Sequence, residues 1–367
     1  MRGNSDKYQS HAVSRRAFAH AAFLGAVTLL VNPFPASAGE QDDRVFADSL
    51  GRNVYVPTTV CAVMPAGDVA QQLVCTLCPE LLSSVASEVS VEDAAEYERA
   101  GLGDIVNLPE TGGSASSGVS GVVADAASWT GASVILDAGV EKEGLSGELN
   151  DLQNEQGVPC LFLDVSFGHL GDAYRKLGDL LGREERAEEL ASYVEASISR
   201  TAVGDGLDEN PIRVLYAPRH CGLDMHSGYS VQVDAVTHVG AAPVAAPRLP
   251  ASAMLDVAKL NNIAIDLVIF DDTDSFDQLK SREGEAWDVW KGCSAIADGA
   301  FIVSPALIRS WIGSLVNVQS IGVLWLAYVL RSGVSDSKIV HEAKLFYNLF
   351  YGLEIDESEL RELIGLC

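Results

Sequence analysis

The sequence predicts an α/β protein built from two lobes that are joined by a long helix. Three observations support this prediction. Short apolar runs alternate with helical, polar stretches before residue 169, a long helical pattern occupies residues 169–200, and a second set of apolar runs begins at residue 212. Strands that alternate with helices pair in parallel, because each helix returns the chain to the same end of the sheet.

Residues 1–38 have the pattern of an export signal. Paired Arg15 and Arg16 precede an apolar run over residues 17–31, and a small-residue cleavage motif follows at Ala36–Ala38. Paired arginines are typical of the twin-arginine (Tat) route. The apolar run is too short to span a membrane comfortably. We therefore expect a signal that is either cleaved or kept as an anchor, and a protein in the periplasm or on the outer face of the cytoplasmic membrane.

The charge of the chain excludes several classes of partner. All 367 residues together carry a formal net charge of −26, and residues 1–38 contribute +3, which leaves −29 on the remainder. Such a surface repels phosphate backbones and anionic lipids. We therefore expect no nucleic-acid partner, and membrane contact only through a membrane protein or an uncleaved signal. The hydrophobic content of 48% is that of a folded globular chain.

The first lobe is expected over residues 39–168. Two β-branched stretches, Val54–Val56 and Val60–Met64, precede a helical pattern that Pro79 should interrupt, because proline cannot donate the helical hydrogen bond. Further strands are expected in "GASVILDAG" and "PCLFLD". A Gly/Ser loop at residues 108–121 separates the two pairs of strands.

The seven cysteines are an odd number for an exported protein. Cys75 and Cys78 are close enough in sequence to form a local disulfide, although the flanking residues lack the context of a thioredoxin motif. Cys160 is expected to be a small buried core residue. No cysteine follows the apolar run of the signal closely enough to be a lipid anchor.

A connecting helix is expected over residues 169–200, and the second lobe over residues 201–367. Apolar residues recur at helical spacing through the connecting segment, although Gly178 and Gly182 weaken the case for one unbroken helix. The strands of the second lobe are expected in "IRVLYAP", "AIDLVIFDD" and "GAFIVSP".

Two helices are expected near the C-terminus, in "KLFYNLFYGLEIDESEL". Gly352 is placed to end the first helix, and Asp356 with Glu359 three residues later is typical of a cap for the second. Four apolar residues share one face of the first helix: Ala343, Phe346, Tyr347 and Phe350.

Taken together, these segments resemble the substrate-binding proteins of ABC-type importers for iron-siderophore complexes, haem and vitamin B12. The most specific matches are the connecting helix, "AYRKLGDLLGREERAEELASYVE", and the ending "FYNLFYGLEI". The resemblance implies two Rossmann-like lobes with small parallel sheets, a long backbone helix between them, a ligand cleft between the lobes, and terminal helices packed on the second lobe. It also implies a monomer without enzymatic activity, whose partners are an ABC permease and its ATPase.

The segment after the first strand of the second lobe, "YAPRHCGLDMHSG", is the richest in ligand chemistry. Histidine, cysteine and methionine side chains can ligate a transition metal or haem iron, and arginine can pair with a carboxylate. Siderophores and corrinoids arrive with their metal already enclosed, so direct coordination by the protein stays open. The candidate ligand residues in this segment are Arg219, His220, Cys221, Met225 and His226.

Further candidate ligand residues follow other strands of the two lobes. In the second lobe, Arg309 and Trp311 come after "FIVSP", where Trp311 suits either an aromatic ligand wall or internal packing. His169 and His238 are expected to be ordinary surface or core residues. The first lobe contributes Met64, Thr111, Gly112, Gly113 and Ser114.

The chain departs from the family pattern in two places. The segment "WIGSLVNVQSIGVLWLA" lacks a Pro pair that is often found there, and the docking glutamates are missing. The family carries a docking glutamate on each lobe, and the matching positions here are Ala124 and Ala258. Asp125 and Asp256 lie beside them and are the candidate permease-docking residues. The departures are consistent with an atypical permease or a changed ligand.

The sequence therefore predicts an extracytoplasmic binding protein that captures a ferric siderophore, a haem or a corrinoid, with no intrinsic cofactor. One alternative is a binding protein for a bare metal or a metal oxyanion. Another is a haem- or metal-buffering envelope protein that serves no transporter. No paired acid–base constellation points to an enzyme.

Overall fold

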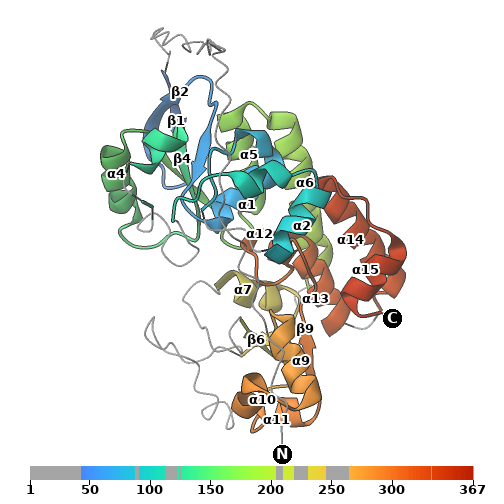
Figure 1. Cartoon of the computed structure of the whole chain (residues 1–367). Helices are drawn as coiled ribbons and strands as arrows, with labels where there is room; N and C mark the ends of the chain where they lie inside the picture. The colour runs from blue at the N-terminus through green and yellow to red at the C-terminus, as the bar shows by residue number, and fades with distance from the viewer. Residues whose placement is uncertain are drawn as a thin grey trace, which may run out of the picture. The chain divides into compact units, whose positions relative to one another are not determined.

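The computed structural model describes residues 43–86, 91–112, 122–123, 125–203, 210–218, 230–244, 264–331 and 333–366. These residues form an α/β protein with two small parallel sheets and many helices, as the sequence predicts (Figure 1).

The first lobe is built on a three-stranded parallel sheet with the strand order β3-β4-β5. Its strands are β3 (Val63–Pro65), β4 (Val134–Gly139) and β5 (Cys160–Asp164). β1 (Asp43–Ala47) and β2 (Asn53–Pro57) form a separate antiparallel pair. Nearly all residues of the three parallel strands are buried, as in a sheet that is covered on both faces.

The helices of the first lobe include α1, which ends at Leu77 ahead of Pro79, as predicted. The disulfide considered for Cys75 and Cys78 is not formed, because both are free, buried thiols. Cys160 is fully buried, as predicted. The helices are α1 (Asp68–Leu77), η1 (Pro79–Leu81), α2 (Val91–Arg99), η2 (Gly103–Asn107), α3 (Ala126–Thr130) and α4 (Leu145–Gln156).

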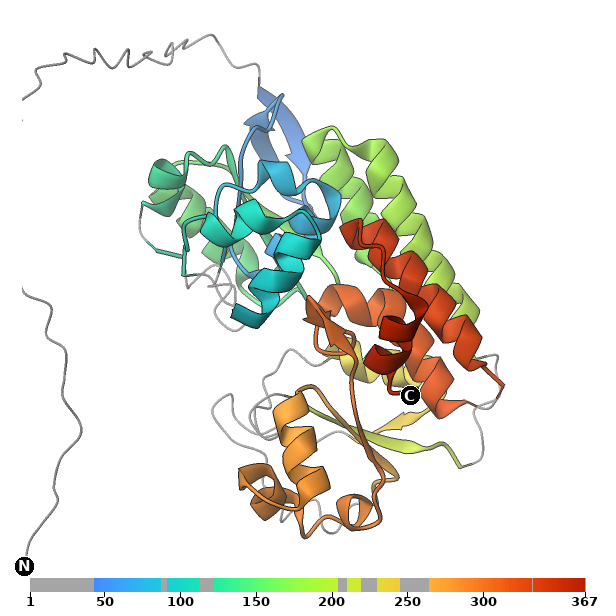
Figure 2. The same ribbon diagram turned by 45° about the vertical axis from the view of Figure 1, so that its right-hand side comes forward.

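The segment expected to be one connecting helix is a helical hairpin. α5 (Leu170–Leu181) ends at Gly182, whose φ of 64° is left-handed, and α6 (Glu184–Thr201) runs back along it (Figure 2). A Cβ atom added at Gly178 would lie 2.4 Å from the Cβ of Ala187, so a glycine is required where the helices touch. Only α6 therefore continues toward the second lobe.

The second lobe is built on a four-stranded parallel sheet with the strand order β7-β6-β8-β9. Its strands are β6 (Arg213–Ala217), β7 (Ala242–Pro243), β8 (Leu267–Phe270) and β9 (Phe301–Val303). A short hairpin follows, formed by β10 (Ala306–Leu307) and β11 (Arg309–Ser310). The helices are α7 (Ser230–His238), α9 (Thr273–Ser281), α10 (Glu285–Trp290), α11 (Ser294–Ala297), α12 (Leu315–Asn317), the π-helical turn η4 (Val318–Gly322) and α13 (Val323–Leu330).

The terminal helices are α14 (Asp336–Tyr351) and α15 (Glu357–Ile364), with Gly352 ending α14 in the left-handed conformation, as predicted. The last helix begins directly after Asp356, as predicted, but the side-chain hydrogen bonds of a capping box are not formed. Asp356 makes no capping hydrogen bond through its side chain, and Glu359 pairs instead with Arg99 of α2. All four residues predicted to share one face of α14 are buried.

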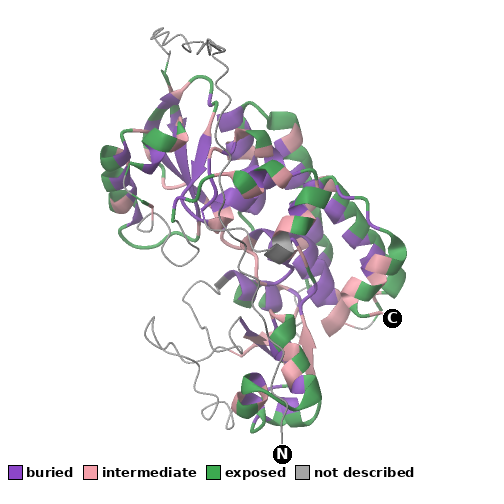
Figure 3. Cartoon of the chain, viewed as in Figure 1, coloured by how far each residue is buried: buried purple, intermediate pink, exposed green. Residues whose placement is uncertain are grey.

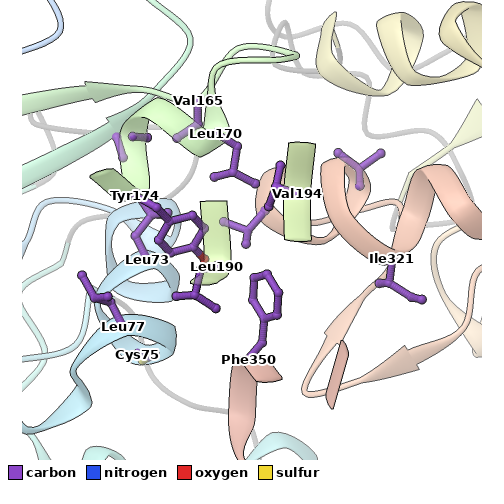
Figure 4. Close-up of a cluster of buried hydrophobic side chains, with 14 of the residues drawn as sticks. Leu73, Cys75, Leu77, Val165, Leu170, Tyr174, Leu190, Val194, Ile321 and Phe350 are labelled. Carbon is purple, nitrogen blue, oxygen red and sulfur yellow. The ribbon is translucent and has the colours of Figure 1, made fainter. Parts of the chain in front are cut away.

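The terminal helices contact the first lobe and the helical hairpin as well as the second lobe, which extends the packing that the resemblance implies. The Phe350 ring lies edge-on to Tyr174 of α5 and to Tyr193 of α6. Figure 4 shows Tyr174 and Phe350 within one cluster together with Leu73 of α1 and Leu190 of α6. Buried residues run through this region, and exposed ones lie on its outer faces (Figure 3).

The buried carboxyl of Asp137 in β4 gives a pH-dependent prediction. Burial raises the pKa of Asp137 from 3.8 to about 6, against the opposing charge of Lys142. A carboxyl with a raised folded-state pKa stabilises the protein below its unfolded pKa, and that contribution is lost as the pH rises through about 6. Asp137→Asn should therefore be more stable than wild type at pH 7.5, by up to about 3 kcal/mol, and nearly equal to it at pH 3.5.

Urea denaturation at both pH values measures this effect. Asp151→Asn, which changes an exposed carboxyl on α4, is the matched control and should show little difference between the two pH values. An Asp137→Asn variant that is less stable than wild type at pH 7.5 would contradict the prediction.

Candidate functional site

The carboxyl ends of the parallel strands are where an α/β sheet binds ligands, and both lobes place polar residues there. In the first lobe, β5 ends at Asp164 and leads through residues 165–169 into α5. In the second lobe, β8 is followed directly by Asp271 and Asp272. We describe these two edges first, and then the residues predicted from the sequence.

The two lobes are tied together by two separate sets of buried hydrogen bonds, which we call the interlobe network. The first set joins Gln72 of α1 to Asn317 and Tyr351, and the second joins Gln319 to the loop after β5. Gln72 donates to Asn317 Oδ1 at 2.8 Å and to the Tyr351 hydroxyl at 3.0 Å. The side chains of Gln72, Asn317 and Gln319 are almost completely buried. Buried amides with all these partners fix a single arrangement, because any other leaves polar groups unpaired.

Gln319 forms the second set of interlobe hydrogen bonds, with the loop after β5. Its Oε1 atom accepts a hydrogen bond from the Gly168 N–H at 2.8 Å, and its amide donates to the Val165 carbonyl at 2.8 Å. The Phe167 ring packs against His238 of α7, with ring centroids 5.2 Å apart. The loop at the carboxyl edge of the first sheet is therefore held directly at the junction with the second lobe.

Asp164, Ser166 and His169 form a hydrogen-bonded chain in the same loop. The Ser166 hydroxyl donates to Asp164 Oδ2 at 2.9 Å and lies 2.9 Å from His169 Nδ1. The Ser166 N–H also donates to Asp164 Oδ1, at 2.8 Å. The His169 side chain is 58% exposed, whereas that of Asp164 is 27% exposed.

At the carboxyl edge of the second sheet, Tyr216 and Asp271 meet between neighbouring strands. The Tyr216 hydroxyl donates to Asp271 Oδ2 at 2.9 Å. A Cβ atom added at Gly313 would lie 2.4 Å from the same carboxylate, so the backbone at residue 313 approaches it closely.

Two candidate ligand residues of the first lobe, Met64 and Thr111, are buried in the structure. Met64 is fully buried in β3, where the Thr130 hydroxyl lies 3.8 Å from its sulfur, so ligand contact would require this packing to change. Thr111 is also fully buried, and its hydroxyl donates to the Val85 carbonyl. Gly112 has a φ of 77°, the turn conformation expected of it. Gly113 and Ser114 lie outside the described residues.

Of the candidate ligand residues in the second lobe, Trp311 and Arg309 lie within the described residues and the others do not. Trp311 is fully buried, and its indole N–H donates to the Tyr347 hydroxyl at 2.7 Å, so it packs inside the protein. Arg309 in β11 is half-buried. Burial raises the pKa of Cys75 in α1 to about 12, and the positive charge of Arg309 acts in the opposite direction by lowering it. The remaining candidates lie outside the described residues: Arg219, His220, Cys221, Met225 and His226.

The β10–β11 hairpin that carries Arg309 turns at a strained residue. Ile308 has a φ of 66°, a conformation that a β-branched side chain rarely adopts, and it is almost completely buried. The Asn317 amide donates to the Arg309 carbonyl at 3.2 Å, and the Tyr347 hydroxyl lies 3.4 Å from the Leu307 carbonyl. The interlobe network therefore helps to hold this turn in place.

The docking candidate Asp125 is exposed, directly before α3, with a φ of 59°. Val123 and Trp129 on either side of it are about half exposed, at 50% and 48%. Asp256 lies outside the described residues. Exposed apolar residues therefore lie two positions before and four positions after this carboxylate in the sequence.

Sequence reasoning missed the His169 chain and the interlobe network. The available signal was "DVSFGHLG", which places Asp, Ser and His directly between a strand and a helix. Within the described ranges, no group of three or more His, Cys, Asp or Glu side chains is placed to hold a metal ion. Those ranges also contain no helix with both the length and the apolarity of a membrane span.

Comparison with solved structures defines the class of fold. An ABC transporter solute-binding protein from Sulfurospirillum deleyianum superposes with a TM-score of 0.71 at 18% identity, covering 88% of this chain and 99% of its own. The molybdate-binding protein MolA of Haemophilus influenzae, bound to molybdate, superposes with a TM-score of 0.66 at 15% identity, covering 86% of this chain and 99% of its own. CeuE of Helicobacter pylori with Ni(II) bound superposes with a TM-score of 0.61 at 11% identity, covering 86% of this chain and 98% of its own.

The chain therefore has the fold of the two-lobed periplasmic solute-binding proteins of ABC transporters, which confirms the fold expected from the resemblance. No family model and no curated protein matches the sequence.

Proposed function

We propose that this protein is an extracytoplasmic substrate-binding protein of an ABC-type importer, without enzymatic activity, and that its ligand is a metal complex. The observation that carries the proposal is the fold, which is shared over 86–88% of the chain with solute-binding proteins of known structure. A ferric siderophore, a haem or a corrinoid is the proposed ligand. The protein itself is proposed to be a monomer without an intrinsic cofactor.

A metal oxyanion is the second candidate ligand. It is favoured by the similarity to MolA, which was solved with molybdate bound. An oxyanion site needs a few converging N–H groups and cations, whereas a chelate site needs a larger and more apolar pocket. The two candidates therefore differ in the size of the ligand that the protein should retain.

Native mass spectrometry of protein purified from its own organism, together with an absorbance spectrum, tests the proposed function. We expect a retained ligand whose added mass and spectrum identify a siderophore, a haem or a corrinoid. An added mass that matches an oxyanion would favour the second candidate. A protein that retains nothing, and binds none of these compounds when titrated, would contradict the proposal.

Arg219 and His220 are proposed as ligand contacts. A guanidinium against this acidic surface suits the carboxylates of a ferric siderophore or the propionates of a haem. If both contacts are buried on binding, removing one should weaken binding by about 2 to 3 kcal/mol, or roughly thirty- to a hundredfold. Arg219→Ala and His220→Ala should do so while the melting temperature of the unliganded protein stays nearly unchanged.

Titration with a ferric siderophore, haem and cobalamin measures these affinities, and His341→Ala on the exposed face of α14 is the matched control. If one compound binds the wild type tightly and neither substitution alters its affinity, the assigned segment is wrong.

Export through the Tat route is a further part of the proposal. The route depends on the arginine pair of its signal. Changing both Arg15 and Arg16 to Lys should therefore hold the precursor in the cytoplasm, as measured by fractionation and immunoblotting. Unchanged export of the double variant would show that another pathway carries the protein.

Docking on the permease is proposed through Asp125 and Asp256. The exposed side chains of Val123 and Trp129 beside Asp125 would add apolar contact area to the carboxylate.

A further inference from the structure

His169 stands where a ligand contact from the first lobe is expected, although sequence reasoning assigns it no role. It follows the carboxyl end of β5 directly, at the start of α5. The preceding residues are fixed at the lobe junction by the hydrogen bond from Gly168 to Gln319 and by the contact of Phe167 with His238. The imidazole therefore has a defined position at the edge where parallel sheets bind ligands.

The hydrogen-bonded chain determines which ring nitrogen of His169 carries the proton. Ser166 has one hydroxyl proton, which it donates to the Asp164 carboxylate at 2.9 Å. Its oxygen must then accept at the 2.9 Å contact with His169, so Nδ1 carries a proton. In the neutral imidazole, Nε2 then has the free lone pair. Among the described residues Nε2 has no hydrogen-bond partner, and the side chain is largely exposed.

This arrangement is that of a histidine prepared to bind a metal. Metal-binding histidines in proteins usually donate their other ring N–H to a carboxylate, a backbone carbonyl or a water, which fixes the tautomer and the orientation of the ring. Here Asp164, held in turn by the Ser166 N–H, supplies that support through the Ser166 hydroxyl. One imidazole fills one coordination position, which suits a metal whose other positions are occupied by the ligand.

We propose that Nε2 of His169 is the first-lobe donor to a transition metal carried by the bound ligand. This inference rests on the proposed function, because it names a contact of the same site. It restricts the ligand to a complex whose metal keeps one open or exchangeable position. Imidazole nitrogen suits zinc, copper, iron and nickel, and it does not suit a hard cation such as magnesium.

The test follows each histidine by two-bond ¹H–¹⁵N correlation in protein labelled with ¹⁵N-histidine, with the signals of the seven histidines assigned from single-residue variants. His169 should be in the Nδ1–H form. Zn²⁺ added alone should shift its Nε2 signal at a concentration about tenfold lower than that needed for the exposed His341. Ser166→Ala should remove both the tautomer preference and the tenfold difference.

His169 in the Nε2–H form, or a Zn²⁺ response equal to that of His341, would overturn the inference. The proposed function would stand in that case if native mass spectrometry identifies a retained chelate. A protein that retains and binds no ligand would overturn the proposed function, and with it the role of His169. The two failures are therefore measured separately.

Discussion

Replacing Gln319 by Ala is expected to lower the free energy of unfolding by about 3 kcal/mol. The substitution leaves the Gly168 N–H and the Val165 carbonyl without the partner that each has at 2.8 Å. Groups that lose their hydrogen bonds in a buried site cannot recover the full hydration that they have in the unfolded chain, so each adds to the loss.

Urea denaturation of the unliganded protein measures the effect. Asn154→Ala, which changes an exposed amide on α4, is the matched control and should stay within about 0.5 kcal/mol of wild type. A loss below about 1 kcal/mol for Gln319→Ala would show that these two hydrogen bonds contribute little in solution.

Replacing Trp311 by Ala is expected to cost about 4 kcal/mol of stability, because a fully buried indole is replaced by a cavity. Trp311→Phe keeps most of the ring and loses only the hydrogen bond to Tyr347, so its cost should be smaller. The pair separates a packing role from the ligand-wall role that the sequence left open. We expect Trp311→Phe to bind the identified ligand as tightly as wild type.

Thermal and urea unfolding measure the stabilities, and titration measures the affinity. Trp129→Ala removes an indole that is 48% exposed, and it is the control for losing a tryptophan at the surface. A Trp311→Phe variant that folds normally but binds the ligand poorly would restore Trp311 to the ligand site.

Local patterns in the sequence were enough to predict most strands of the two parallel sheets and the terminal helices, but not the short strands β1, β7, β10 and β11. The spacing of apolar residues in α14 and the glycine at its end act within one helix, so they hold in any tertiary setting. The side-chain bonds of a capping box at Asp356 are not formed, and the Glu359 carboxylate pairs with Arg99, which lies 260 residues away in sequence. Pairs between residues this far apart in the sequence cannot be predicted from a local pattern.

The turn between α5 and α6 was missed for a related reason. Helical spacing continues on both sides of Gly182, and the pattern of one long helix is the same as that of two helices packed side by side. The distinguishing signal was the pair of small residues, Gly178 and Ala187, which allow the two helices to approach closely. Such a pair indicates close helix packing only once it is known that the chain reverses direction between the two residues.

The candidate site was predicted at the level of strand ends, but not of single side chains. Met64 and Trp311 lie near strand ends, yet both point into the interior, where they are fully buried. His169 was set aside because the sequence does not show that Ser166 and Asp164 hold its ring. Which side chain faces a ligand depends on contacts that only the folded chain brings together.

The interlobe network also constrains the order in which the chain can fold. Gln72 completes its hydrogen bonds only with Tyr351, which lies 279 residues later in the sequence. Because the chain is synthesised from its N-terminus, the Gln72 side chain in α1 cannot form this hydrogen bond until almost the whole protein has been made. A nascent first lobe would expose the surface that α14 later covers, and a chain shortened before α14 could not bury it. The proposed Tat route carries folded proteins, so export by that route would require the chain to complete this fold after synthesis and before it crosses the membrane.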